Sequence, residues 1–305
     1  MHGNTAGTSN PVVVVAKSGS TAISEPEEPS ALWPLVSQYS AGLPAVSRTV
    51  FRLNELLSVT PVDLRAVIET VRRDPSVAAR VLQMVAEVSG TEDSYCTLGE
   101  CIVLLGISRL RNLVLTTPMA PSDPLIATQI EALWQHSRLA SQLAERVAHE
   151  CGHPEPERAA IAGLLHDIGK FPQLLAASAD SGHSGLPLHC QIGARLATVW
   201  KLPLFLIDAI ENHHAPAASR RDPFIVSLTA VADEVCLACG VTLQSACISP
   251  ALTFDCKEVL TRHLPCLSEV RKTALAEALQ SEFMRWVNSP STVDEEIHSL
   301  PLSNG

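Results

Sequence analysis

Apolar residues recur at intervals of three and four along most of this 305-residue chain, which is the pattern of helices that bury one face. No stretch of useful length alternates apolar and polar residues, as a half-buried strand would. The first two apolar series are Val46, Val50, Leu53 and Leu57, followed by Leu64, Val67, Ile68 and Val71. The fold class is therefore predicted to be all-α.

Proline and glycine mark where these helices begin and end. Asp74-Pro75 predicts a helix start, because aspartate caps free backbone N–H groups and proline fits the first helical turn. Gly106 separates two further short helices. The segment 118–124 has three prolines in seven residues, so we expect the chain to divide there into two helical units.

The composition of the two ends differs from that of the middle. The first 40 residues are rich in Gly, Ser, Thr, Pro and Glu, which is typical of a disordered segment, and the last residues of the chain also lack a helical pattern. The predicted parts are a disordered tail at 1–40, an N-terminal helical lobe at 43–120, a helical bundle at 125–240, C-terminal helices at 241–288 and a disordered tail at 289–305.

Composition and charge argue against several classes of protein. With 46% hydrophobic and 18% charged residues, the chain can bury a full core. No apolar run approaches the ~18 residues of a membrane span, and the run at 11–16 is too short for a signal peptide, so we expect a cytoplasmic protein. Nine scattered cysteines indicate reduced thiols rather than disulfides. The net charge of -10 argues against nucleic acid as a partner.

A histidine and an aspartate lie side by side within an apolar stretch. Residues 163–170 read Gly-Leu-Leu-His-Asp-Ile-Gly-Lys, and apolar sequence rarely contains such a pair unless the two side chains have a role there. Side chains from other predicted helices could complete a site in the core of a bundle. The candidate metal ligands are His136, His166, Asp167, His189, His213, His214 and Asp233.

This ligand set indicates the type of metal and its chemistry. Imidazole and carboxylate groups suit Fe, Mn or Zn, and seven ligands exceed the needs of one tetrahedral ion, so we expect two divalent ions. Such a pair can activate a bridging water and neutralise a phosphoryl oxygen. Lys170, one turn after His166, could hold the same phosphate. Asp167 and Lys170 are accordingly the predicted catalytic residues.

Each candidate also has a simpler interpretation when it is taken alone. His136 and His189 could be ordinary hydrogen-bonded helix residues. The pair His213-His214 could end a helix, since histidine suits the negative end of the helix dipole and Ala215-Pro216 follows. Asp233 could be a solvated side chain. Their joint occurrence with the His-Asp pair favours a metal cluster over several independent coincidences.

Four segments of the chain resemble one known family. They are Leu43-Pro44-Ala45-Val46, Arg73-Asp74-Pro75 with Ala79-Arg80-Val81-Leu82, Leu104-Leu105-Gly106 with Leu110-Arg111-Asn112-Leu113, and the His-Asp stretch at 163–170. Together they resemble the HDOD domain over about residues 43 to 240. The resemblance implies a helical bundle of HD type with an additional helical N-terminal lobe, as in modules of bacterial signalling proteins.

The HDOD domain is related to the HD phosphohydrolase superfamily and to the HD-GYP cyclic-di-GMP phosphodiesterases. The metal pattern of the HD-GYP class, carried over by position, falls on the seven candidate ligands, and its phosphate-contacting lysine falls on Lys170. The Gly-Tyr-Pro tripeptide is missing, because residues 215–219 read Ala-Pro-Ala-Ala-Ser. The resemblance therefore implies a metal site without the substrate loop for cyclic-di-GMP.

Two functions follow from these observations. The favoured hypothesis is a regulatory module that binds a protein partner in a signalling pathway. The alternative is a metal-dependent phosphohydrolase that acts on a nucleotide or another phosphoester. A shared fold does not by itself carry an activity, so whether the chain is an enzyme stays open at this point.

Overall fold

The computed structural model describes residues 32–89, 97–177, 188–238, 241 and 255–288. Within these ranges all regular structure is helical, apart from a single bridge between Ala45 and Met119. The predicted all-α fold is confirmed. None of the helices in these ranges combines the length and the apolarity that a membrane span requires.

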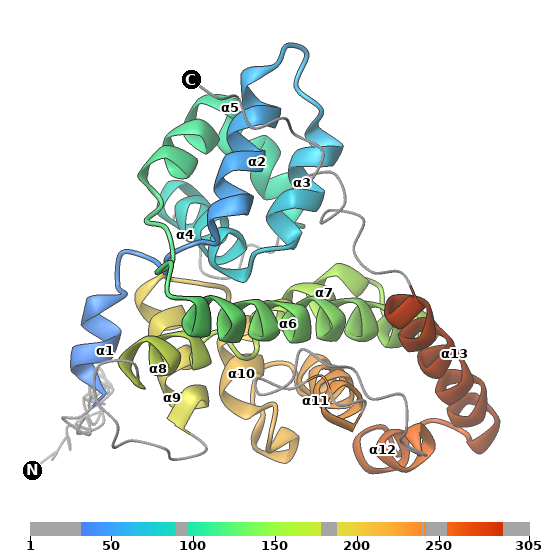
Figure 1. Ribbon diagram of the computed structural model, residues 1–305. Coiled ribbons are helices and arrows are strands. Elements are labelled where there is room, and N and C mark those ends of the chain that lie inside the picture. Colours follow the sequence, from blue (N-terminus) through green and yellow to red (C-terminus); the bar gives the residue numbers. More distant parts are fainter. Residues whose placement is uncertain (1–31, 90–96, 178–187, 239–240, 242–254, 289–305) are drawn as a thin grey trace, which may run out of the picture.

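The N-terminal lobe stands apart from the rest of the molecule, above the long helix α6 in Figure 1. A short connection of residues 117–123 leads from the lobe into that helix, where the prolines predicted a break. The lobe consists of α2 (Ser47–Ser58), α3 (Leu64–Arg72), α4 (Pro75–Ser89) and α5 (Leu98–Thr116).

One buried carboxylate joins the starts of two helices in the lobe. Asp74 accepts hydrogen bonds from the backbone N–H groups of Ser76 at 3.0 Å and Val77 at 3.4 Å, which caps α4. It also accepts one from Val46 N at 2.9 Å, just before α2. Burial raises the pKa of Asp74 to about 6, although these hydrogen bonds lower it. Asp74 is therefore a structural residue with its acceptor positions filled.

Gly106 interrupts α5 as the sequence predicts. Its backbone has φ 73° and ψ 162°, so the helical path is broken there. A side chain would be strained at this positive φ, and glycine adopts it without cost. The helix itself begins with a capping box between Thr97 and Glu100, which fixes its first turn.

The first helix corrects one prediction. We expected disorder as far as residue 40, but α1 (Trp33–Gln38) is a helix with Val36 buried, and residues 1–31 lie outside the described part. The indole N–H of Trp200 donates to the backbone oxygens of Tyr39 at 3.2 Å and Ser40 at 3.0 Å. A six-residue helix has too few turns to show a periodic pattern, and its stability comes from such tertiary contacts.

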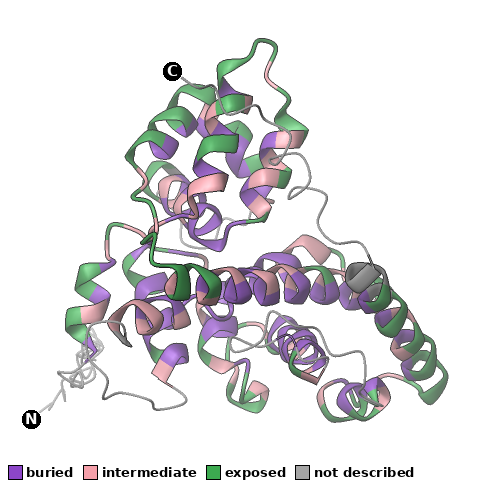
Figure 2. Ribbon diagram, viewed as in Figure 1, coloured by how far each residue is buried: buried purple, intermediate pink, exposed green. Residues whose placement is uncertain are grey.

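The helical bundle is built around α6, which lies horizontally across the middle of the molecule in Figure 1. Figure 2 shows buried residues along α6 and α11, where the core of the bundle lies. The bundle consists of α6 (Pro124–Glu150), α7 (Pro156–Leu165), α8 (Lys170–Ala177), α9 (Leu188–Val199), α10 (Leu204–Asn212) and α11 (Pro223–Ala238).

Two further helices follow the bundle in the sequence. They are α12 (Cys256–His263) and α13 (Glu269–Asn288), and they lie at one end of α6 and α11. An ion pair joins α12 to the bundle, since Arg262 Nη1 lies 2.7 Å from Glu234 Oε2. The predicted tail at 289–305 lies outside the described residues.

Candidate metal centre

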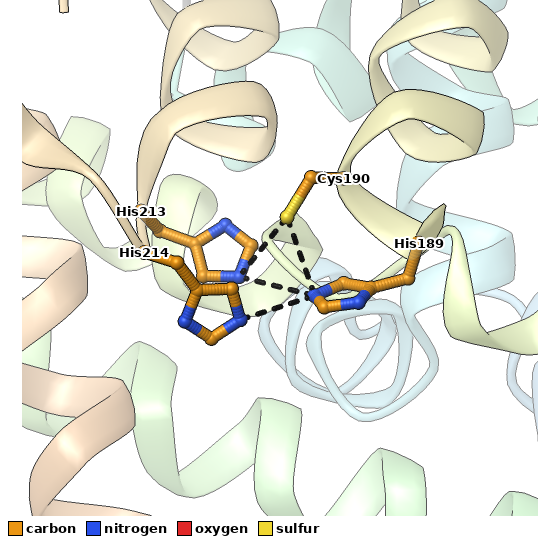
Figure 3. A group of neighbouring side chains, drawn as sticks. All are labelled: His189, Cys190, His213 and His214. Atoms are coloured by element: carbon orange, nitrogen blue, oxygen red, sulfur yellow. Dashed lines mark hydrogen bonds between the residues drawn. The ribbon is translucent and has the colours of Figure 1, made fainter. Parts of the chain in front are cut away.

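All seven predicted ligands meet in the core of the bundle, together with one cysteine that was not predicted. They form two groups, and within each group the possible ligand atoms lie within 4.8 Å of one another. The first cluster is His136, His166, Asp167 and Asp233. The second cluster is His189, Cys190, His213 and His214, which Figure 3 shows with the side chains converging.

His166 and Asp167 lie in a tight turn between α7 and α8. Two glycines explain the turn. A Cβ on Gly163 would lie 2.6 Å from Ala140 O in α6, and a Cβ on Gly169 would lie 2.0 Å from His189 O in α9. The chain packs so closely against both helices that only glycine fits. The turn therefore brings the carboxylate of Asp167 next to α9.

Short distances connect the members of the first cluster. His136 Nε2 lies 3.2 Å from His166 Nε2, 3.1 Å from Asp233 Oδ1 and 3.4 Å from Asp167 Oδ2. His166 Nε2 lies 3.3 Å from Asp167 Oδ2 and 3.5 Å from Asp233 Oδ1. All four residues are buried. Two imidazoles from α6 and the turn thus face two carboxylates from the turn and α11.

In each of these two imidazoles, the hydrogen-bond partner of Nδ1 determines whether Nε2 carries a hydrogen or a lone pair. His166 Nδ1 lies 2.8 Å from Gly163 O, and His136 Nδ1 lies 3.1 Å from Val241 O. A carbonyl oxygen only accepts, so each Nδ1 carries the hydrogen. In the neutral rings both Nε2 atoms then present lone pairs to each other. A proton or a metal cation is needed to relieve that repulsion.

The second cluster also brings imidazole nitrogens close together. His189 Nε2 lies 3.4 Å from His213 Nε2 and 3.2 Å from His214 Nε2 (Figure 3). His213 Nδ1 donates to Ile210 O at 3.0 Å, so its Nε2 also presents a lone pair. The side chain of His214 is 39% exposed, whereas the other members are buried. This cluster is therefore the part of the site that reaches the surface.

Asp167 connects the two clusters. Its Oδ2 belongs to the first cluster, while its Oδ1 lies 3.3 Å from His189 Nε2 and 3.7 Å from His213 Nε2 in the second. Lys170 Nζ forms an ion pair with Oδ2. One carboxylate thus faces both groups of imidazoles.

Two buried oxygens show that the site fits a cation. Among the described residues, Asp167 Oδ1 and Asp233 Oδ1 have no hydrogen-bond partner, although almost no solvent reaches them. A buried charged oxygen without a partner costs free energy unless a cation binds it. The His and Asp cluster, with imidazole and carboxylate donors and one nearby thiol, is consistent with metal binding.

The pKa shifts differ between the two clusters. Burial alone would lower the pKa of His166, but the charges of Asp167 and Asp233 and the close contact with Asp167 raise it to about 10. Burial and the charge of His166 hold the pKa of His213 well below its usual range. Without metal, the first cluster therefore holds a proton, while His213 is in the neutral form that binds metals.

Cys190 is the residue that sequence reasoning missed. It follows His189 directly, and adjacent helical residues project about 100° apart, so the sequence does not indicate that both face one site. Burial, together with the charge of Asp167, raises the pKa of the Cys190 thiol to about 12. Without metal, the thiol keeps its proton.

Comparison with known proteins agrees with this arrangement. The HDOD domain family matches residues 43–183, which cover the lobe, α6, α7 and α8. The chain contains an HDOD domain. The HD domain family matches residues 133–237, a range that includes both clusters. The site of this HDOD protein thus lies in its HD-type bundle.

Solved structures show the same fold at low sequence identity. The MmoQ response regulator from Methylococcus capsulatus str. Bath is 19% identical with a TM-score of 0.58, covering 77% of this chain and 98% of that one. A virulence factor from Campylobacter jejuni subsp. jejuni is 16% identical with a TM-score of 0.53, covering 88% of this chain and 98% of that one. At these identities the similarity shows the fold alone.

One curated relative matches a shorter segment. Ribonuclease Y from Mycoplasmoides gallisepticum is 31% identical over an alignment of 104 residues, and the match covers 32% of this chain. The match covers only 17% of that ribonuclease. The similarity thus concerns one segment of a much longer protein.

Proposed function

We propose that this HDOD protein is a cytoplasmic regulatory module of bacterial signal transduction whose bundle holds two divalent ions. The observation that carries the metal site is Asp167, because its two oxygens face two separate groups of imidazole nitrogens. The signalling role is supported by the HDOD match and by a structural neighbour that is named as a response regulator. Iron, manganese and zinc suit the donor atoms.

The two clusters divide the proposed ligands between the ions. His136, His166 and Asp233 would hold the first ion, and His189, His213 and His214 would hold the second, with one oxygen of Asp167 facing each group. When bound, such ions polarise a phosphoryl oxygen and activate a water. Lys170 pairs with Asp167 and is partly exposed beside it, so its charge supports an anionic ligand at the same place.

The segment after His214 favours a module over a cyclic-di-GMP enzyme. Residues 215–219 lack the Gly-Tyr-Pro tripeptide. Hydrogen bonds to Asp208 hold the end of this segment in place. The carboxylate of Asp208 accepts hydrogen bonds from Ser219 Oγ at 2.7 Å and from Arg221 N at 2.8 Å. A segment held against α10 in this way offers no extended loop to position a substrate, and such positioning supplies much of the rate in enzymes.

A partner protein would dock on the surface of the molecule away from the metal site. The lobe exposes several large apolar side chains, among them Phe51, Val103 and Leu115. Exposed apolar side chains mark a binding surface where they form a contiguous patch. The net charge of -10 makes a nucleic acid a poor partner for this chain.

The second candidate function is a metal-dependent phosphohydrolase acting on a nucleotide or another phosphoester. The observation that favours it is the complete set of ligand types, which a purely structural domain does not need. The similarity to a protein named ribonuclease Y also supports phosphoester chemistry.

Metal analysis combined with an activity panel separates these functions. The full chain is loaded separately with Mn, Fe and Zn, its metal content is measured, and cyclic-di-GMP and a panel of nucleotides are offered. We expect two ions per chain and no turnover of cyclic-di-GMP. Metal-dependent turnover of any compound at ~1 s⁻¹ or more that vanishes in Asp167→Ala would show that the chain is a phosphohydrolase rather than a regulatory module. Failure of the chain to hold metal would overturn the proposed site.

A further inference from the structure

The second cluster contains a sulfur atom at ligand distance from its imidazoles. Cys190 is in the first turn of α9, and its Sγ lies 3.4 Å from His189 Nε2 and 3.9 Å from His213 Nε2. Figure 3 shows the sulfur pointing into the space between the rings of His189 and His213. Only 4% of the residue is exposed, so the thiol belongs to the interior of the site.

An ordinary buried cysteine fills apolar space, which is the simplest alternative. The sulfur of Cys190 instead lies against ring nitrogens, and one of them, His213 Nε2, presents a lone pair. A thiol has one hydrogen and can donate it to only one of these two nitrogens. The position of the sulfur is thus better explained by a shared cation than by packing.

The separations within the cluster match those of ligands on one ion. Zinc binds imidazole nitrogen at about 2.0–2.1 Å and thiolate sulfur at about 2.3 Å, which at tetrahedral angles places two nitrogens about 3.3 Å apart and a nitrogen and a sulfur about 3.6 Å apart. The nitrogen pairs here are 3.4 Å and 3.2 Å apart, and the sulfur lies 3.4 Å and 3.9 Å from two of them.

We propose that Cys190 is a thiolate ligand of the ion in the second cluster, where it acts together with His189, His213 and His214. The inference rests on the proposed metal centre and adds a ligand that selects the metal. On binding, the thiol proton leaves for solvent as the sulfur–metal bond forms. A soft sulfur donor favours zinc or iron over harder ions such as Mn²⁺ and Mg²⁺. The second position is therefore selective for a thiophilic ion.

X-ray absorption spectroscopy of the zinc-loaded full chain tests the bond directly. We expect a sulfur neighbour at about 2.3 Å from zinc, at one sulfur for every two zinc ions. The signal disappears in Cys190→Ala and in Cys190→Ser, and it remains in Cys256→Ala, which removes another buried thiol. Circular dichroism establishes that each variant is folded.

Binding measurements with two metals give an independent readout. We expect Cys190→Ala to weaken zinc binding at the second position at least about tenfold and to leave manganese binding within about twofold. Zinc bound by nitrogen and oxygen alone, or a sulfur signal that survives in both Cys190 variants, would overturn this inference and leave the metal centre intact. A chain that binds no zinc at all would overturn both.

Discussion

The N-terminal lobe and the HD-type bundle both bury carboxylates, but the hydrogen-bond partners of these carboxylates differ. In the lobe, Asp74 receives hydrogen bonds from the backbone of two helix starts, so the group is satisfied by the chain itself. In the bundle, Asp167 and Asp233 each keep one buried oxygen without a hydrogen-bond partner among the described residues. A buried charge stabilises a fold when its partners are present and costs free energy when they are not. The lobe satisfies its buried carboxylate through the backbone, whereas the buried carboxylates of the bundle, together with the imidazoles around them, are consistent with metal binding.

A glycine exchange in each region gives the largest expected contrast. A Cβ on Gly169 would lie 2.0 Å from His189 O and 2.6 Å from Gly193 N, so the turn and α9 must separate. We expect Gly169→Ala to lower the free energy of unfolding by about 3 kcal/mol or more, or to prevent folding. Urea unfolding followed by circular dichroism measures this.

The matched control is Gly99→Ala in α5 of the lobe. There the nearest atom to the added Cβ is the terminal methyl of Ile68 at 3.3 Å, which can move. Alanine is favoured over glycine in a helix by about 1 kcal/mol, so the lobe variant should be as stable as the wild type or slightly more stable. If both variants unfold alike, close backbone approach is not what distinguishes the bundle.

The second prediction concerns stabilisation by metal. Zinc at 100 times its dissociation constant should raise the free energy of unfolding by about 2.7 kcal/mol, because it binds only the folded chain. Asp167→Asn should abolish this increase, since it removes the charge that both clusters share. Thermal unfolding with and without zinc measures the effect. An undiminished increase in Asp167→Asn would show that zinc binds elsewhere.

An aspartate-to-asparagine substitution in the lobe should lower the stability of the fold without changing zinc binding. In Asp74→Asn, the amide group can replace only one carboxylate oxygen as an acceptor, so the N–H of Val46 or of the α4 cap loses its partner. We expect a loss of about 2 kcal/mol in the free energy of unfolding and unchanged zinc content. A loss of zinc in this variant would mean that the lobe and the metal site are coupled.

Sequence reasoning predicted the residue types of the site better than their arrangement. His166, Asp167 and Asp233 are polar residues in apolar helical sequence, so the pattern alone marks them. The turn at His166-Asp167 is set by glycines that pack against Ala140 and His189, and these contacts are between segments far apart in the chain. Such contacts leave no periodic signal.

Two other features could not be predicted from the sequence, because they also depend on contacts between distant segments. The helix α1 is short and depends on Trp200, which lies 161 residues after Tyr39 in the chain. Cys190 faces the imidazoles of His213 and His214 because α9 packs against α10. In both cases tertiary packing, rather than local propensity, decides the structure.

The smallest expected effect is the pH dependence that Asp74 gives to the lobe. Burial raises its pKa to about 6 from an ordinary value of 3.8, so the folded state binds the proton more tightly than the unfolded state. The stability contribution of this protonation is fully present below pH 3.8 and is lost as the pH rises through about 6. Lowering the pH from about 7 to about 5 should therefore stabilise the wild type relative to Asp74→Asn by about 1 kcal/mol. Urea unfolding of both proteins across this range, in metal-free buffer, measures the difference. A difference that stays constant with pH, or that shrinks on acidification because the wild type loses stability faster, would show that the backbone donors outweigh burial and keep Asp74 charged.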